Sequence, residues 1–398
     1  MRYAVVFALF VLSMITYIDR VCIATAKEPI SAELGLSDSA MGMVFGAFAL
    51  GYALAQIPSG WFADRFGPRV ALAAVVTAWS ALTALTGAAW SLVSLVTIRF
   101  LFGVGEAGAF PGSARAICNW LPSGERGRAN GVLFSGSRLG AAFSFPLLAW
   151  MLTRYQWRTA FFILGLLGAA WAAVWLLWFR DHPAKPLPVE GSAAVSISLA
   201  NVFRSPPMLL AMLQYFASNF TFFICLSWML PYLKLQYHLA NDVAAAYAIP
   251  PLLLGAASQW VTGWLVDRLY RSQWRAWSRR IPGMAGFALA TLGVLAVTRA
   301  ATPGAAVLAF TLAAFGADMT ISPSWVFCAD IAGKNAGSVS GSMNMVGNIG
   351  SFVSANAFPY LQGATGSASA YFFTAGLLNL AGLWCWYRMR SVEMERSE

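Results

Sequence analysis

The sequence has 398 residues, of which 59% are hydrophobic and only 11% are charged. A soluble domain carries about 25% charged residues, so this composition excludes a soluble fold and predicts an integral membrane protein. The net charge of +10 would favour nucleic-acid binding in a soluble protein. Here the basic residues mostly flank apolar runs, so we expect a lipid bilayer and no nucleic acid as the partner.

Apolar runs of about 20 residues, the length that crosses a bilayer as a helix, recur along the chain. We predict an all-α protein with twelve transmembrane helices, at residues 3–26, 39–61, 69–90, 92–117, 129–151, 157–179, 207–233, 243–265, 281–298, 303–328, 336–360 and 369–388. The first run is too long for a signal peptide and contains Asp19 and Arg20, so we expect it to be retained.

The longest polar interruption lies near the middle of the chain and is rich in proline. We therefore predict an N-terminal six-helix bundle at 1–180, a cytoplasmic linker at 181–206, a C-terminal six-helix bundle at 207–390 and a cytoplasmic tail at 391–398. With the N-terminus inside, most arginines and lysines fall in cytoplasmic segments. The positive-inside rule then places both termini in the cytoplasm.

Two charges lie inside the predicted fourth helix. Arg99 and Glu106 are seven residues apart, which is two turns along one face. Gly103, Gly105 and Gly108 thin the helix around them, so neighbouring backbones can approach. A permanent Arg99–Glu106 pair that only locks helices together is one explanation, but two turns span about 10 Å. Intramembrane charges usually line a water-filled path or a binding cavity, and we favour that reading.

Two further charges, Asp19 and Arg20, lie in the predicted first helix. Asp19 falls in the half of this helix that is nearer the outside of the membrane. The fourth helix runs back from outside, so Arg99 can meet Asp19 at similar depth, with Glu106 near the midplane. Arginine stays charged, and the two histidines, His182 and His238, lie in predicted loops. The leading proton carriers are therefore Asp19 and Glu106. We see no metal or nucleotide motif and expect no cofactor other than protons.

The second half supplies uncharged polar candidates. The eleventh helix carries Asn344, Asn348 and Ser351 at helical spacing. Side-chain amides bind the hydroxyl groups of a substrate well, although a stripe that only joins helices is the alternative. The seventh helix has two faces with polar residues, and Asn219 lies on one of them; either face can line a cavity.

Two further charges lie in predicted helices. Arg138, next to Ser137, is a candidate cation for a second substrate carboxylate, or it extends to the membrane surface. Asp318 falls in the tenth helix roughly where Glu106 falls in the fourth. We hypothesise that Asp318 partners Arg138, or a cation or hydroxyl of the substrate.

The stretch Gly60–Arg69 matches the pattern G-x-x-x-D-R-x-G-x-R, and Gly263–Arg268 repeats its first part. This pattern resembles the cytoplasmic loop signature of the major facilitator superfamily. The resemblance implies two pseudo-symmetric six-helix bundles that rock about a central site. Asp64 would then be a latch that pairs with basic residues across the two halves. The latch residues that we expect are Gly60, Asp64, Arg65, Gly67, Arg69, Asp267 and Arg268.

A narrower resemblance rests on the stretch Tyr17–Arg20 in the first helix, Tyr52 in the second, and Arg99 with Glu106 in the fourth. These residues look like those of the anion/cation symporter subfamily. Its members include the bacterial galactonate/proton symporter and hexuronate and glucarate transporters. Asn344 lies where these symporters have a substrate-binding asparagine.

This resemblance implies a role for each residue. Asp19 and Glu106 would be the protonatable carboxylates. Arg20 and Arg99 would arrange or release them, and Tyr52 would bind the substrate by a hydrogen bond.

The prediction is a proton-coupled symporter, not an enzyme, that takes up a small organic anion by a rocker-switch mechanism. We expect a functional monomer in the bacterial inner membrane, and a sugar acid or related carboxylate as substrate. The alternatives are a symporter of aromatic or dicarboxylic acids, a drug efflux antiporter and a ligand sensor that does not transport. Arginines in the first and fourth helices argue against efflux of cations.

Overall fold

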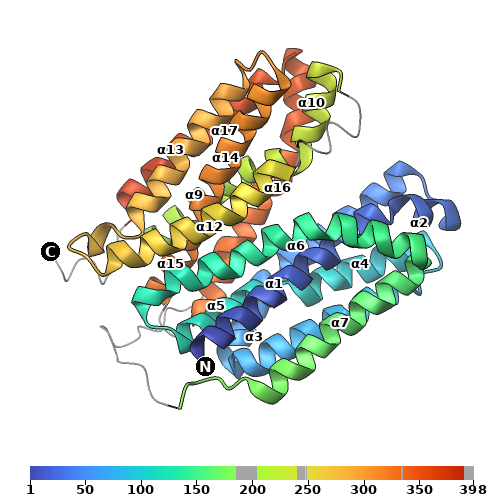
Figure 1. The fold of residues 1–398 in the computed structure, drawn as a ribbon, viewed down its shortest axis with the longest axis horizontal. Helices are drawn as coiled ribbons and strands as arrows, with labels where there is room; N and C mark the ends of the chain where they lie inside the picture. Colours follow the sequence, from blue (N-terminus) through green and yellow to red (C-terminus); the bar gives the residue numbers. More distant parts are fainter. Residues whose placement is uncertain (185–203, 240–246, 248, 333–334, 390–398) are drawn as a thin grey trace. The chain divides into compact units, whose positions relative to one another are not determined.

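The computed structural model describes residues 1–184, 204–239, 247, 249–332 and 335–389, and their regular secondary structure is helical (Figure 1). Seven helical segments of this part are long and apolar enough to cross a membrane. The described chain forms two compact units. Unit 1 comprises residues 1–121, 136–184 and 335–345, and unit 2 comprises residues 122–135, 204–239, 249–332 and 346–389.

Unit 1 is built from helices of the first part of the chain and the start of one late helix. Its helices are α1 (Arg2–Thr25), α2 (Lys27–Leu34), α3 (Asp38–Thr86), α4 (Leu92–Glu106), α5 (Ala109–Trp120), α7 (Trp157–Trp178), residues 136–154 of α6 (Arg126–Arg154) and residues 336–345 of α16 (Ala336–Thr365). In this unit α3 packs against α4, α5 and α7.

The predicted second and third helices are continuous in α3, with a sharp break at Gly67. Gly67 has φ 80°, a backbone conformation that glycine adopts without steric cost. A β-carbon there would also lie 2.7 Å from Oδ1 of Asp181, so the site has no room for a side chain. The predicted gap at residues 62–68 is therefore a kink inside one helix and not a loop between two helices.

The predicted fourth helix is also broken, because α4 ends at Glu106 and α5 begins at Ala109. Close packing against α3 precedes the break. A β-carbon on Gly103 would overlap the backbone oxygen of Phe48, and one on Gly51 would overlap that of Phe100. The glycines thus let α4 approach α3 closely, as the sequence predicted for Gly103, and they bring the charges of α4 near α3.

Unit 2 contains the remaining described helices. They are η1 (Ser123–Glu125), α9 (Pro206–Phe223), η2 (Ile224–Trp228), α10 (Met229–Tyr237), α12 (Ile249–Tyr270), η3 (Arg275–Trp277), α13 (Arg280–Val297), α14 (Pro303–Met319), α15 (Ile321–Ala332), α17 (Ser369–Arg388), residues 126–135 of α6 and residues 346–365 of α16. The predicted helix 207–233 is thus interrupted by the π-helical turn η2.

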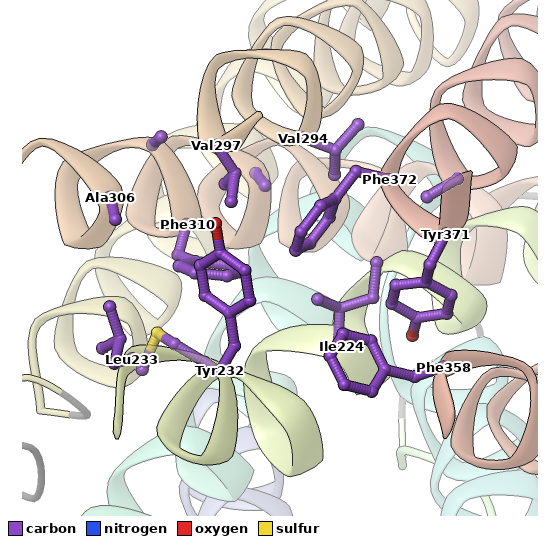
Figure 2. Packing of buried hydrophobic residues seen from close by; sticks show 14 of the residues in the cluster. Ile224, Tyr232, Leu233, Val294, Val297, Ala306, Phe310, Phe358, Tyr371 and Phe372 are labelled. Atoms are coloured by element: carbon purple, nitrogen blue, oxygen red, sulfur yellow. The ribbon is translucent and has the colours of Figure 1, made fainter. Parts of the chain in front are cut away.

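An aromatic core holds the helices of unit 2 together (Figure 2). Tyr232 of α10 meets Phe310 of α14 and Phe372 of α17 with ring centroids 5.7 and 5.3 Å apart. Tyr371 packs edge-on against Phe358 at 5.0 Å. Such edge-to-face contacts add to the free energy gained by burying the rings, so the core fixes α10 against α14 and α17.

The predicted boundaries of the two bundles remain a prediction. Most of the linker 181–206 and the tail 391–398 lie outside the described residues. At the start of the linker, Trp120 Nε1 donates to the backbone oxygen of Arg180 at 2.7 Å. Asn119 donates to the backbone oxygen of Asp181 at 2.9 Å, so the chain after α7 returns to the end of α5.

Candidate functional site

An ion pair between two helices of unit 1 forms the centre of the candidate site. Arg20, near the C-terminal end of α1, donates Nε–H to Oε1 of Glu106, the last residue of α4. The Glu106 side chain is fully buried and that of Arg20 is 18% exposed. The mutual attraction of such a pair offsets part of the cost of removing two charges from water. Glu106 therefore has its ionic partner on another helix, and Arg99 contributes from a distance.

Aromatic rings hold both arginines of the site. The Arg20 guanidinium lies 4.3 Å from the ring centroid of Tyr52 and 5.3 Å from that of Phe48. The Arg99 guanidinium lies 5.0 Å from the same Phe48 ring and 4.4 Å from Phe102. A cation over an aromatic face is attracted by the ring quadrupole. Phe48 thus faces both guanidinium groups, and their positions are coupled through one ring.

Asp19 lies in the same buried region and is 1% exposed. Its Oδ2 accepts a hydrogen bond from Trp79 Nε1 of α3 at 3.1 Å. Arg99 and Glu106 of α4 both interact electrostatically with this carboxylate. The structure therefore brings together the charges that the sequence singled out in the first and fourth helices.

Several polar atoms of this cluster have no hydrogen-bond partner among the described residues. They are Asp19 Oδ1, Arg20 Nη2, Arg99 Nε and Glu106 Oε2. A buried polar atom without a partner costs free energy, and such atoms concentrate at functional sites. One oxygen of each carboxylate can thus take up a proton, and Nη2 of Arg20 and Nε of Arg99 can each donate to a ligand.

A hydrogen-bonded group of uncharged residues lies beside the charges. Asn344 of α16 donates Nδ2–H to Oε1 of Gln56 at 3.0 Å and to the hydroxyl of Tyr52 at 3.4 Å. Tyr52 and Gln56 are one turn apart on α3, and all three side chains are buried. Two of the residues predicted to bind substrate, Tyr52 and Asn344, are therefore in contact.

Ser137 and Arg138 lie in the part of α6 that belongs to unit 1, where they are 1% and 4% exposed. Arg138 Nη1 lies 3.4 Å from Ser137 Oγ. Gly136 and Gly140 place α6 against the α1 backbone at Phe10 and Met14. Arg138 is therefore buried, and it does not extend to the surface.

The other predicted site residues belong to unit 2. Asp318, fully buried in the last turn of α14, accepts from Gln259 Nε2 at its backbone oxygen (3.0 Å) and at Oδ1 (3.4 Å). Asn219 donates to the backbone oxygen of Tyr215 at 2.8 Å, and Asn348 lies on α16. The hypothesis that Asp318 partners Arg138 stays a prediction.

The predicted latch residue Asp64 caps the start of α16 in unit 1. Its Oδ1 accepts from the backbone N–H of Gly337 at 2.8 Å, and its Oδ2 accepts from the N–H and the hydroxyl of Ser338, both at 2.7 Å. Arg115 lies 4.0 Å away. A carboxylate at a helix N-terminus binds the free N–H groups and the positive end of the helix dipole. Gly60 has no room for a β-carbon, because that carbon would overlap the Gly337 oxygen.

The C-terminal part of the first motif, Gly60–Arg69, contacts the end of α7 and the residues that follow it. The backbone N–H of Arg69 donates to Asp181 Oδ1 at 2.8 Å, and its guanidinium donates to the Leu176 oxygen. Gly67 allows this approach, as described above, and Arg65 is exposed.

The second motif makes the equivalent contact in unit 2. Asp267 accepts from the backbone N–H groups of Gly127 at 2.8 Å and Arg128 at 3.0 Å, at the start of α6. Its carboxylate is fully buried and lies 3.9 Å from the Arg128 guanidinium. Arg268 stacks on Trp264. Each aspartate of the repeated motif therefore caps the N-terminus of a helix.

Two residues of the site escaped the sequence analysis. Trp79 lies in an apolar run, where an aromatic residue gives no signal of its polar N–H. Gln56 gave a signal, because it is a polar residue one turn after Tyr52 inside a predicted helix.

Comparisons with known proteins agree with this architecture. A family model described as Major Facilitator Superfamily matches residues 9–355. A Cupriavidus necator protein named "Probable sulfoacetate transporter SauU" is 33% identical, covering 95% of this chain and 91% of its own. The Bacillus subtilis hexuronate transporter is 28% identical, covering 94% of this chain and 90% of its own. The solved structure of the human organic anion transporter MFSD10 (TETRAN) has a TM-score of 0.78 at 15% identity, covering 97% and 99% of the two chains, so the two share a fold.

Proposed function

The chain belongs to the major facilitator superfamily, and we propose that it takes up a small organic anion together with protons. The observation that carries this proposal is the buried Arg20–Glu106 pair with Asp19 and Arg99 beside it. Two arginines supply fixed positive charge for an anion. Two carboxylates supply groups that change charge with a proton.

Membership of this family confirms two predictions made from the sequence. The chain has the all-α fold of a multi-pass membrane transporter, and it is a transporter and not an enzyme.

The proposed cycle follows from the geometry of the ion pair. A proton on Glu106 removes the negative charge that holds Arg20. The released guanidinium then binds the carboxylate of the substrate, and bidentate binding of this kind is typical of arginine. Asp19 takes a second proton beside Arg99. The loaded protein changes from outward-facing to inward-facing, and loss of the protons inside restores the Arg20–Glu106 pair and releases the anion.

We propose a sugar acid or related acid as the substrate. The named relatives transport sulfoacetate and hexuronate according to their names, and both are small acids. Tyr52, Gln56 and Asn344 place hydroxyl and amide groups beside the charges, which suits the hydroxyl groups of a sugar acid.

The remaining candidates extend the proposed site. Arg138 with Ser137 would bind a second acidic group, and Asn219, Asn348 and Asp318 would contact the substrate from the second half. We further propose that the chain acts as a monomer in the bacterial inner membrane, with both termini in the cytoplasm. Protons are the coupling ion, and no cofactor takes part.

The test is uptake by proteoliposomes of a panel of sugar acids and sulfoacetate, with and without an imposed pH gradient. We expect wild type to accumulate at least one acid when the outside is acidic. Glu106→Gln should lose accumulation and keep exchange of internal for external substrate. Glu28→Gln, at an exposed site on α2, is the matched control and should behave as wild type. Substrate accumulation that is unchanged when a proton ionophore is added would contradict the proposal.

A further inference from the structure

We infer that Trp79 is a positioning residue that selects the oxygen at which Asp19 takes up its proton and sets the pH of that step. The inference rests on the proposed function, in which Asp19 carries a proton. Trp79 donates its indole N–H to Oδ2 of Asp19 at 3.1 Å. Oδ1 of the same carboxylate accepts no hydrogen bond of good geometry in the described chain, and the Thr83 hydroxyl is the other polar group that faces this carboxylate.

The indole is held in one orientation by its surroundings. Trp79 is fully buried. Its backbone packs against Gly105 of α4, where a β-carbon would lie 3.4 Å from Trp79 N. A β-carbon on Gly168 of α7 would lie 3.6 Å from Trp79 Nε1. Gly105 thus leaves room for the Trp79 backbone beside α4, and Gly168 leaves room for the indole nitrogen beside α7, where its N–H donates to Asp19.

Other groups face Asp19 from every side of the cluster. Glu106 and Arg99 face it from α4, and Thr83 faces it from α3, one turn after Trp79. On α1, Arg20 precedes it, and Cys22 donates to its backbone oxygen at 2.9 Å. The charges of Glu106 and Arg99 act on the whole carboxylate. The indole differs from them because it contacts a single oxygen.

The hydrogen-bonding chemistry of indole determines how this contact affects protonation of Asp19. The indole nitrogen donates and cannot accept, and a carbonyl oxygen accepts a hydrogen bond better than a protonated hydroxyl oxygen does. The N–H on Oδ2 therefore favours protonation at Oδ1. A hydrogen bond to a carboxylate also favours its ionised form, so the contact delays protonation until the outside is more acidic.

Replacement of the indole N–H tests the inference. In Trp79→Phe the ionised carboxylate loses one charge-assisted hydrogen bond. We expect the pH of half-maximal uptake to rise by about one unit. The KM for substrate at saturating proton concentration should not change, because Trp79 does not contact the substrate. Benzothienylalanine at position 79 keeps the outline of the ring and lacks the N–H. It should give the same shift if the smaller phenylalanine impairs folding.

The matched control is Trp175→Phe. Trp175 is also buried in unit 1, but its indole donates to the backbone oxygen of Pro68 at 3.3 Å. We expect its pH profile to match that of wild type. Profiles of both position-79 variants that coincide with wild type would overturn the inference and leave the proposed function standing. Wild-type uptake that does not respond to pH would instead overturn the proposed function, and this inference with it.

Discussion

At the scale of single residues, the site depends on charges that compensate each other inside the membrane. Arg20 contacts one carboxylate and the faces of Tyr17, Phe48 and Tyr52. Its guanidinium therefore stays in place by attraction to four groups. Loss of one member of a buried pair leaves the other charge without compensation, which is more costly than loss of both.

This asymmetry gives a prediction for stability. Arg20→Leu should lower the free energy of unfolding by about 3–5 kcal/mol, because Glu106 then has no ionic partner. The double variant Arg20→Leu/Glu106→Leu should recover much of that loss. Thermal unfolding of the purified variants in detergent measures both effects. If the loss of stability in the double variant equals the sum of the losses in Arg20→Leu and Glu106→Leu, the two residues do not act as a pair.

Sequence reasoning found the charges of this site but not all of their partners. Arg99 and Glu106 were recognisable because charge is rare in a membrane helix. The Arg20–Glu106 contact joins residues far apart in the sequence, so spacing along one helix does not reveal it. Trp79 and Gln56 act through polar atoms whose importance depends on which neighbours the fold supplies.

At the scale of elements, hydropathy located the spans better than their interruptions. The break after Glu106 and the turn η2 lie inside continuous apolar runs, whereas Gly67 lies in the predicted gap at residues 62–68, where the sequence predicts a loop and the structure has a kink. Hydropathy averages over about 19 residues and does not detect a change of a single backbone angle. Gly103 gave a better signal, because closely packed helices require small residues, whereas the equivalent contact of Gly51 was found only in the structure.

The short helix α2 is fixed to unit 1 by one carboxylate. Glu33 accepts from Trp157 Nε1 at 2.6 Å and from Arg158 Nε at 2.9 Å. Arg158 also donates to the backbone oxygens of Gly87 and Ala89. Arg158 thus connects α2, the start of α7 and the turn after α3.

The contacts of α2 predict a pH-dependent stability. Hydrogen bonds from Trp157 and Arg158 lower the pKa of Glu33 below its ordinary value of 4.5. Because the folded pKa is the lower one, the stabilisation is complete above pH 4.5 and is lost as the pH falls through the folded value. Glu33→Gln should therefore lower Tm slightly at neutral pH, and the difference from wild type should vanish in acid.

Thermal unfolding at a series of pH values measures this difference. The control is Glu28→Gln, an exposed change on the same helix that should leave Tm unaltered. A difference between Glu33→Gln and wild type that persists unchanged in acid would show that the contacts do not depend on the charge of Glu33.

At the scale of the whole molecule, the repeated loop motif recurs as a repeated contact. Asp64 caps α16, and Asp267 caps α6. The capped turn of α16 belongs to unit 1, and the helix continues into unit 2; α6 begins in unit 2 and continues into unit 1. In the predicted bundles, each aspartate therefore comes from one half of the chain and caps a helix of the other half. In the proposed rocker-switch cycle, a cap of this kind would break as the halves move.

This arrangement predicts that the two caps control the rate of transport and not its pH dependence. Asp64→Ala removes both acceptor oxygens, and loss of a cap costs about 1 kcal/mol, so the capped state should become about five-fold less populated. Initial uptake rates should fall, while the pH of half-maximal uptake stays that of wild type. Asp267→Ala should have the same effects as Asp64→Ala. Ser338→Ala removes only the hydroxyl contact to Asp64 and should lower the initial uptake rate less.

The double variant Asp64→Ala/Asp267→Ala then separates two ways in which the caps can act. If both caps stabilise the same state of the transport cycle, their losses add, and the capped state should be depleted by about the product of the single effects. Both caps are formed in this structure, so a partial recovery of the uptake rate in the double variant would contradict stabilisation of the same state. Uptake that is unchanged in Asp64→Ala, in Asp267→Ala and in the double variant would contradict a latch role, because the aspartates would then only complete the ends of two helices.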